Sequence, residues 1–158
     1  MKVRIGQGID FHRLEKGIQL WLGGINVPSE KGCSAHSDGD VLLHAICDAI
    51  LGAAGFEDIG HQFPDNDLQY KNIDSKILLK RSFDLIKKGG FHIINIDSTV
   101  CLEKPKIAPF IPEMKTAISE ILETEPENIS IKATTTEKLG FTGREEGAVA
   151  IAVALLEK

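Results

Sequence analysis

The spacing of apolar and polar positions along the chain predicts several strands and three long helices. Alternation of apolar and polar residues favours half-buried strands, whereas apolar residues that recur every three or four positions favour helices packed on one side. We expect strands over residues 3–7, 18–22, 25–27, 91–102, 129–135 and 148–156, and helices over about 40–54, 75–88 and 112–123. The last strand is almost continuously apolar, which is typical of the centre of a sheet. This order predicts an α/β (α+β) fold with a single mixed β-sheet and helices packed on one face.

The connections between these elements contain turn and cap residues as well as irregular stretches. Gly23-Gly24 predicts an antiparallel hairpin between the second and third strands, and Asp74 is placed to cap the helix that begins at Ser75. Ser29–Ser34 has no regular period, so we expect a mobile loop there that orders around a ligand. Phe56–Tyr70 is an irregular stretch rich in aspartate, and long irregular loops in compact domains are often functional.

Composition narrows the class of protein. The 158 residues are 42% apolar and 26% charged, which suits one soluble globular domain over residues 1–158. A net charge of −5 without a basic run argues against nucleic-acid binding, and the apolar runs are too short to span a membrane. Three cysteines without a CxxC spacing favour a reduced compartment, and Met1-Lys2 leads directly into a strand rather than a secretory leader. We therefore expect a cytoplasmic protein, or one in a plastid-type organelle if a transit peptide was removed.

One polar stripe on an otherwise apolar helix is the first candidate site. Asp40, His44 and Asp48 stand four residues apart and share that stripe. Upstream, Asp10 and His12 alternate on a segment that can be extended, so they can face the same way. Asp10, His12 and His44 thus form a plausible three-ligand zinc site with an open fourth position. The alternative is a histidine with a structural role, and Asp48 is either a partner of His44 or a solvent-facing residue.

The segment from Ala133 to Arg144 is the second candidate site. Adjacent threonines offer hydroxyl and amide donors, and two glycines allow tight turns, a composition that can hold a diphosphate. Glu137 is a candidate oxygen ligand for Mg²⁺, which prefers carboxylates together with substrate phosphates. The alternative is a threonine-rich edge strand followed by a glycine turn.

These segments together resemble one enzyme family. Asp10-x-His12, Ala35-His36-Ser37-Asp38-Gly39-Asp40 with His44, Asp58-Ile59-Gly60 with Phe63-Pro64-Asp65, and Ala133–Arg144 are similar, in order and spacing, to the 2-C-methyl-D-erythritol 2,4-cyclodiphosphate synthases. The resemblance extends over nearly the whole chain. It implies conversion of 4-diphosphocytidyl-2-C-methyl-D-erythritol 2-phosphate to the cyclic diphosphate with release of CMP, a step of the non-mevalonate isoprenoid pathway.

The resemblance also implies roles for individual residues. Asp10, His12 and His44 would hold zinc, and Glu137 would contact magnesium or manganese bound to the substrate diphosphate. His36 and Thr135 would stabilise the transition state. The implied substrate-binding residues are Asp10, His12, His36, Ser37, Asp58, Ile59, Gly60, Phe63, Pro64, Asp65, Asn66, Asp67, Leu102, Glu103, Lys104, Pro105, Lys106, Ile107, Ala108, Thr134, Thr135, Thr136, Glu137, Phe141 and Arg144.

The family resemblance further implies a homotrimer with active sites between subunits. One departure is Ile151, where some relatives carry a glutamate that faces the trimer axis. Two other functions remain open on the residues alone. One is a zinc-dependent hydrolase of a small phosphate ester that uses the same three ligands. The other is a non-catalytic metal or nucleotide sensor.

Overall fold

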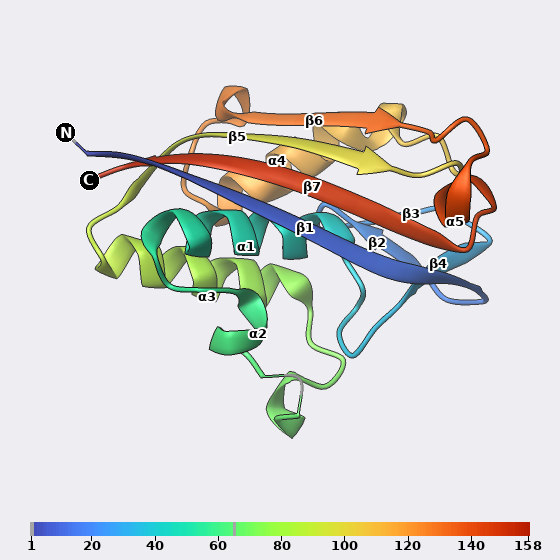
Figure 1. The fold of residues 1–158 in the computed structure, drawn as a ribbon, viewed down its shortest axis with the longest axis horizontal. Helices are drawn as coiled ribbons and strands as arrows, with labels where there is room; N and C mark the ends of the chain where they lie inside the picture. Colours follow the sequence, from blue (N-terminus) through green and yellow to red (C-terminus); the bar gives the residue numbers. More distant parts are fainter. Residues whose placement is uncertain (1, 65) are drawn as a thin grey trace.

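The computed structural model describes residues 2–64 and 66–158, and its centre is a five-stranded mixed sheet (Figure 1). The strands are β1 (Val3–Lys16), β4 (Lys31–Ser34), β5 (His92–Cys101), β6 (Ile129–Thr134) and β7 (Gly147–Glu157), in the order β4-β1-β7-β5-β6. The β5–β6 pair is parallel and the other three pairs are antiparallel. The prediction of a mixed sheet with its apolar last strand in the centre is confirmed.

Three long helices pack on one face of this sheet, as predicted. Helix α1 (Val41–Ala54) lies against β1 and β7, α3 (Ser75–Lys88) packs on α1, and α4 (Ile111–Ile121) contacts β6. Because α1 is enclosed by the sheet on one side and by α3 on the other, nearly all of its side chains are buried (Figure 1). The predicted bounds of α3 and its Asp74 cap are confirmed, since the Asp74 side chain accepts from the Lys76 backbone N–H.

The predicted hairpin forms a small sheet of its own beside the main one. It pairs β2 (Leu20–Leu22) with β3 (Ile25–Val27), and both residues of the Gly23-Gly24 turn have positive φ. β2 begins two residues later than expected. The hairpin therefore adds a second, two-stranded sheet that the single-sheet prediction did not include.

The prediction of a mobile loop at Ser29–Ser34 is wrong for its last four residues. Residues 31–34 form edge strand β4, which pairs with the far end of β1. Cys33 is buried, and a Cβ on Gly32 would lie 2.1 Å from the Gln19 carbonyl oxygen. A strand of four residues is too short to show an alternating pattern, and its partner lies in the part of β1 beyond Gln7, where the sequence pattern did not predict a strand.

The aspartate-rich stretch Phe56–Tyr70 contains local structure that the prediction missed. It includes a short helix, α2 (Ile59–Gln62), and a 3₁₀ turn, η1 (Leu68–Tyr70). Asp58 accepts from the His61 N–H and Asp67 accepts from the Gln69 N–H, so both side chains act as N-caps. Three further short elements lie in the connections: η2 (Ala108–Phe110), η3 (Pro126–Asn128) and α5 (Gly140–Gly143).

The two chain ends lie side by side at one end of the sheet (Figure 1). Lys2 and Lys158 exchange two backbone hydrogen bonds of 3.0 and 2.9 Å, which extends the β1–β7 ladder. The three cysteines are free thiols rather than disulfide partners. Across residues 2–64 and 66–158, no helix is both long and apolar enough to cross a membrane.

Candidate functional site

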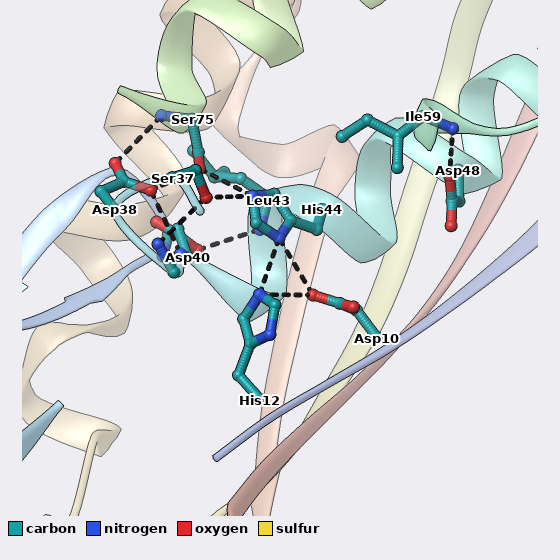
Figure 2. Close-up of polar contacts among 12 residues, drawn as sticks. Asp10, His12, Ser37, Asp38, Asp40, Leu43, His44, Asp48, Ile59 and Ser75 are labelled. Carbon is teal, nitrogen blue, oxygen red and sulfur yellow. Dashed lines mark hydrogen bonds and ion pairs between the residues drawn. The ribbon is translucent and has the colours of Figure 1, made fainter. Parts of the chain in front are cut away.

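Three potential metal ligands converge between β1 and α1. Oδ2 of Asp10, Nε2 of His12 and Nδ1 of His44 form a triangle with sides of 3.0, 3.0 and 3.1 Å (Figure 2). Asp10 and His12 alternate along β1, so both face α1, and His44 lies in the first turn of that helix. The prediction that these three side chains come together is confirmed.

The chemistry of this donor set fits a metal ion. Around a tetrahedral ion with ligand distances of about 2.0–2.1 Å, donor atoms stand roughly 3.3 Å apart, close to the spacing seen here. Burial lowers the pKa of His12. Burial also acts to lower the pKa of His44, but the hydrogen bond and charge of Asp10 outweigh it, so that pKa is raised. The negative charge of Asp10 therefore stabilises a positive charge beside the three donor atoms.

The second nitrogen of His44 faces away from this triangle and contacts two hydroxyls. Nε2 lies 2.8 Å from Oγ of Ser75 and 3.2 Å from Oγ of Ser37. The Ser75 hydroxyl in turn donates to Oδ1 of Asp38 (Figure 2). Sequence reasoning missed Ser75 and gave Asp38 no role, because Ser75 belongs to another helix and nothing in the spacing links it to His44.

The other two members of the predicted polar stripe have structural roles. Asp40 is completely buried, caps α1 through the Leu43 N–H, and accepts from the Gly23 and Gly24 N–H groups of the hairpin turn. Asp48 accepts from the Ile59 N–H at 2.8 Å, away from His44 (Figure 2). Asp48 is thus neither the partner of His44 nor a free surface residue, because it anchors the start of α2.

A cavity of about 410 Å³ opens over the three ligands. Its lining includes eight of the predicted site residues: Asp10, His12, His36, Ser37, His44, Ile59, Gly60 and Phe63. Sequence reasoning did not assign Ser34, Ala35, Tyr70, Ile73 and Leu78, which also line it. These are mostly apolar positions with no chemical signature. The predicted Asp58, Pro64, Asn66 and Asp67 do not line this cavity, and Asp65 lies outside the described residues.

A second cavity of about 360 Å³ lies at the ends of β5 and β6. It is lined by Ala133 and by the predicted residues Leu102, Pro105, Lys106, Ile107, Ala108, Thr134, Thr135 and Glu137. The predicted Glu103, Lys104 and Thr136 stand outside its lining; Glu103 instead accepts from the Lys138 N–H and Lys104 pairs with Glu145. Thr135 Oγ1 lies 3.3 Å from a carboxylate oxygen of Glu137, so the hydroxyl and the carboxylate share one end of this cavity.

The two cavities border different strands of the sheet, β1 and β6, with β7 and β5 between them. Asp10 pairs with Ala150 of β7, Ala150 with Val100 of β5, and Val100 with Ala133 of β6. Three strand spacings, about 14 Å, therefore separate the backbone of Asp10 from that of Ala133. Phe141 and Arg144 line neither cavity and border a third one beside His12. Within one chain, the structure does not bring all the predicted site residues together.

Comparisons with known proteins identify the family. The YgbB family profile matches residues 3–157, so the chain belongs to the YgbB family. The chain is 56% identical over 158 residues to a 2-C-methyl-D-erythritol 2,4-cyclodiphosphate synthase of Bacteroides fragilis, covering 100% of this chain and 99% of that protein. The family resemblance read from the motifs is thereby confirmed.

Solved structures agree with this assignment. The bifunctional IspDF of Campylobacter jejuni is 43% identical with a TM-score of 0.95; the match covers 98% of this chain and 42% of that longer one. A 2C-methyl-D-erythritol-2,4-cyclodiphosphate synthase in its CDP-bound form is 35% identical with a TM-score of 0.90, and the match covers 98% and 100% of the two chains. The similarity in structure therefore supports the same family as the similarity in sequence.

Proposed function

We propose that this chain converts 4-diphosphocytidyl-2-C-methyl-D-erythritol 2-phosphate to 2-C-methyl-D-erythritol 2,4-cyclodiphosphate and CMP, in the non-mevalonate isoprenoid pathway. The observation that carries the proposal is the Asp10–His12–His44 triangle at the base of a cavity, in a chain of the YgbB family. An oxygen of the 2-phosphate attacks the β-phosphorus and forms a new P–O–P bond. The bond from that phosphorus to the oxygen of the α-phosphate breaks, and CMP leaves with the electron pair.

Such a transfer depends on charge neutralisation and on position more than on covalent help from the protein. Asp10, His12 and His44 hold zinc, and Glu137 holds magnesium or manganese with the substrate diphosphate. When bound, these ions supply positive charge at the attacking 2-phosphate and at the diphosphate. The donor set supports this assignment, since one carboxylate and two imidazoles suit zinc and a lone carboxylate suits a hard cation.

The remaining residues bind and orient the substrate. His36 is exposed on the wall of the cavity over the three ligands (the metal cavity), where its imidazole would bind a phosphate of the substrate. Thr135 is half-buried in the second cavity, and its hydroxyl can donate to a phosphoryl oxygen as charge shifts in the transition state. Residues 58–60 and 63–67 hold the erythritol part, whereas 102–108 and 134–137 hold the cytidine. The CDP-bound relative supports a cytidine-diphosphate ligand.

A homotrimer reconciles the two separate cavities with one reaction. In this assembly the metal cavity of one subunit meets the second cavity, which holds the nucleotide, of its neighbour. Within one chain the backbones of Asp10 and Ala133, which border the two cavities, stand about 14 Å apart, too far for groups that act on one diphosphate. The open face of the sheet supports such an assembly. Val3, Ile5, Ile9 and Phe11 of β1 expose 47–73% of their surface on that face, and apolar patches of this kind commonly mark interfaces.

Turnover followed by phosphorus NMR tests the proposal. The protein, loaded with zinc and magnesium, is incubated with the authentic substrate. We expect the resonances of the substrate to be replaced by those of a cyclic diphosphate and of CMP. Formation of inorganic phosphate or of an open-chain 2,4-bisphosphate would instead favour the zinc-dependent hydrolase, and binding without any conversion would favour a sensor.

A further inference from the structure

The two ring nitrogens of His44 have different surroundings, and this difference sets the direction of a hydrogen-bond chain. Nδ1 faces Asp10 and His12, whereas Nε2 faces Ser75 (Figure 2). A neutral imidazole that offers the lone pair of one nitrogen to a metal carries its proton on the other. Metal binding through Nδ1 therefore requires that Nε2–H donates a hydrogen bond.

The Ser75 hydroxyl is placed to accept that bond and to donate a second hydrogen bond to Asp38. Its hydroxyl is fully buried, lies 2.8 Å from Nε2 and donates its own proton to Oδ1 of Asp38. A hydroxyl that accepts from an imidazole and donates to a carboxylate uses both functions at once. The chain of donors thus runs from His44 through Ser75 to Asp38, and the negative charge at its end favours this direction over the reverse one.

The geometry of the chain is fixed by backbone contacts. Oδ2 of Asp38 accepts from the Ser75 backbone N–H at 3.0 Å, and the Asp38 backbone N–H donates to the Ile73 carbonyl at 3.1 Å. These bonds attach the first residue of α3 to the loop before α1. The Ser37 hydroxyl is a weaker alternative acceptor, because it lies 3.2 Å from Nε2 and already accepts from the Gly39 N–H.

We propose that Ser75 and Asp38 are positioning residues that hold the His44 ring with Nδ1 directed at the metal site and Nε2 protonated. This inference rests on the proposed metal site and adds two residues to it. Neither touches the metal or the substrate in this role; both act through His44. Partners of metal-bound histidines typically change metal affinity by about 10–100-fold when they are removed.

Ser75→Ala is the direct test, because it removes the hydroxyl and leaves the backbone N–H that bonds to Asp38. Ser82→Ala is a matched control, since Ser82 is also fully buried on α3 and its hydroxyl has no hydrogen-bond partner among the described residues. Zinc affinity is measured by competition with a chromophoric chelator, and thermal unfolding of the metal-free proteins checks the fold. We expect about 10–100-fold weaker zinc binding in Ser75→Ala and parental binding in Ser82→Ala.

Equal zinc affinity in Ser75→Ala and the parent protein would overturn the proposed chain while leaving the metal site intact. Failure of the parent itself to bind zinc would instead overturn the metal site. If Ser75→Ala does not fold, ¹⁵N-histidine NMR of the zinc-loaded parent decides. The proposal predicts metal on Nδ1 of His44 and a proton on Nε2 that exchanges slowly with water. Metal on Nε2, or a rapidly exchanging Nε2 proton, would overturn it.

Discussion

Gly8 of β1 lies directly against the backbone carbonyl of Ala45 in α1. A Cβ built on Gly8 would stand 1.9 Å from that oxygen, which is far inside van der Waals contact. Gly6 has the same relationship with Ala49, where the distance would be 2.0 Å. Strand and helix therefore touch through their backbones, and this close approach brings Asp10 and His12 within reach of His44.

Gly8→Ala is expected to lower the free energy of unfolding by about 3 kcal/mol. The added methyl group would force α1 away from β1, because the atom it meets belongs to the helix backbone and cannot move aside as a flexible side chain can. The variant should also bind zinc less tightly, since the three ligands move apart. Chemical denaturation of the metal-free proteins at matched concentration measures the first effect, and chelator competition measures the second.

Gly52→Ala is the matched control for this prediction. Gly52 lies in α1, and a Cβ there meets nothing within 4 Å. Alanine in an open helical position gains about 0.5–1 kcal/mol over glycine. A Gly8→Ala variant that is as stable as Gly52→Ala would contradict the importance of the β1–α1 contact.

The sequence was sufficient to predict those features that depend on a residue and its near neighbours along the chain. The continuous apolar run of β7 predicted its central place, and Asp10, His12 and His44 could be grouped because alternation on a strand and position on a helix each restrict direction. Asp74 was identified as a cap because that role depends on adjacent residues alone. Local chemistry and periodicity thus define most of the fold and the metal ligands.

The sequence was insufficient where a role depends on a distant partner. Asp40 and Asp48 stand at the same spacing from His44, yet Asp40 supports the hairpin turn and Asp48 supports α2. The helical spacing alone does not show whether Asp40 and Asp48 contact His44 or a distant segment of backbone. Edge strand β4 was missed for the same reason, because its pairing with β1 is tertiary information.

Asp48→Asn should separate substrate binding from metal binding. We expect zinc affinity close to that of the parent, because Asp48 does not contact His44, and weaker substrate binding, because the Ile59 N–H loses a charged acceptor at the wall of the metal cavity. His44→Ala is the comparison variant and should lose bound zinc and turnover together. A large loss of zinc in Asp48→Asn would contradict this division, and steady-state kinetics with metal analysis measures both quantities.

Ile5→Glu should disrupt the proposed trimer without unfolding the subunit. Ile5 is 73% exposed on the open face of the sheet, so a charge is costly only when a neighbouring chain covers it. Ile77→Glu is the control, because Ile77 is 46% exposed on α3, away from that face. Analytical ultracentrifugation should show smaller species for Ile5→Glu alone. Equal assembly of both variants would argue against an interface at Ile5.

Mixed subunits test whether the active site is shared. Co-expression of His44→Ala and Thr135→Val chains with different tags allows mixed assemblies to be isolated. If one subunit supplies the metal half and its neighbour the nucleotide half, each isolated mixed trimer has one intact site of its three, so roughly a third of the parental activity returns. Sites built within single chains would restore no activity, and each homogeneous variant serves as the background.

The fate of solvent oxygen tests the proposed cyclisation most directly. The reaction is run in ¹⁸O-enriched water with the zinc- and magnesium-loaded protein, and both products are analysed by mass spectrometry. Because the attacking oxygen belongs to the 2-phosphate of the substrate, the cyclic diphosphate and CMP should both form without ¹⁸O. A water nucleophile would instead give an open-chain 2,4-bisphosphate, with ¹⁸O in that product or in CMP, and this result would contradict the cyclase assignment.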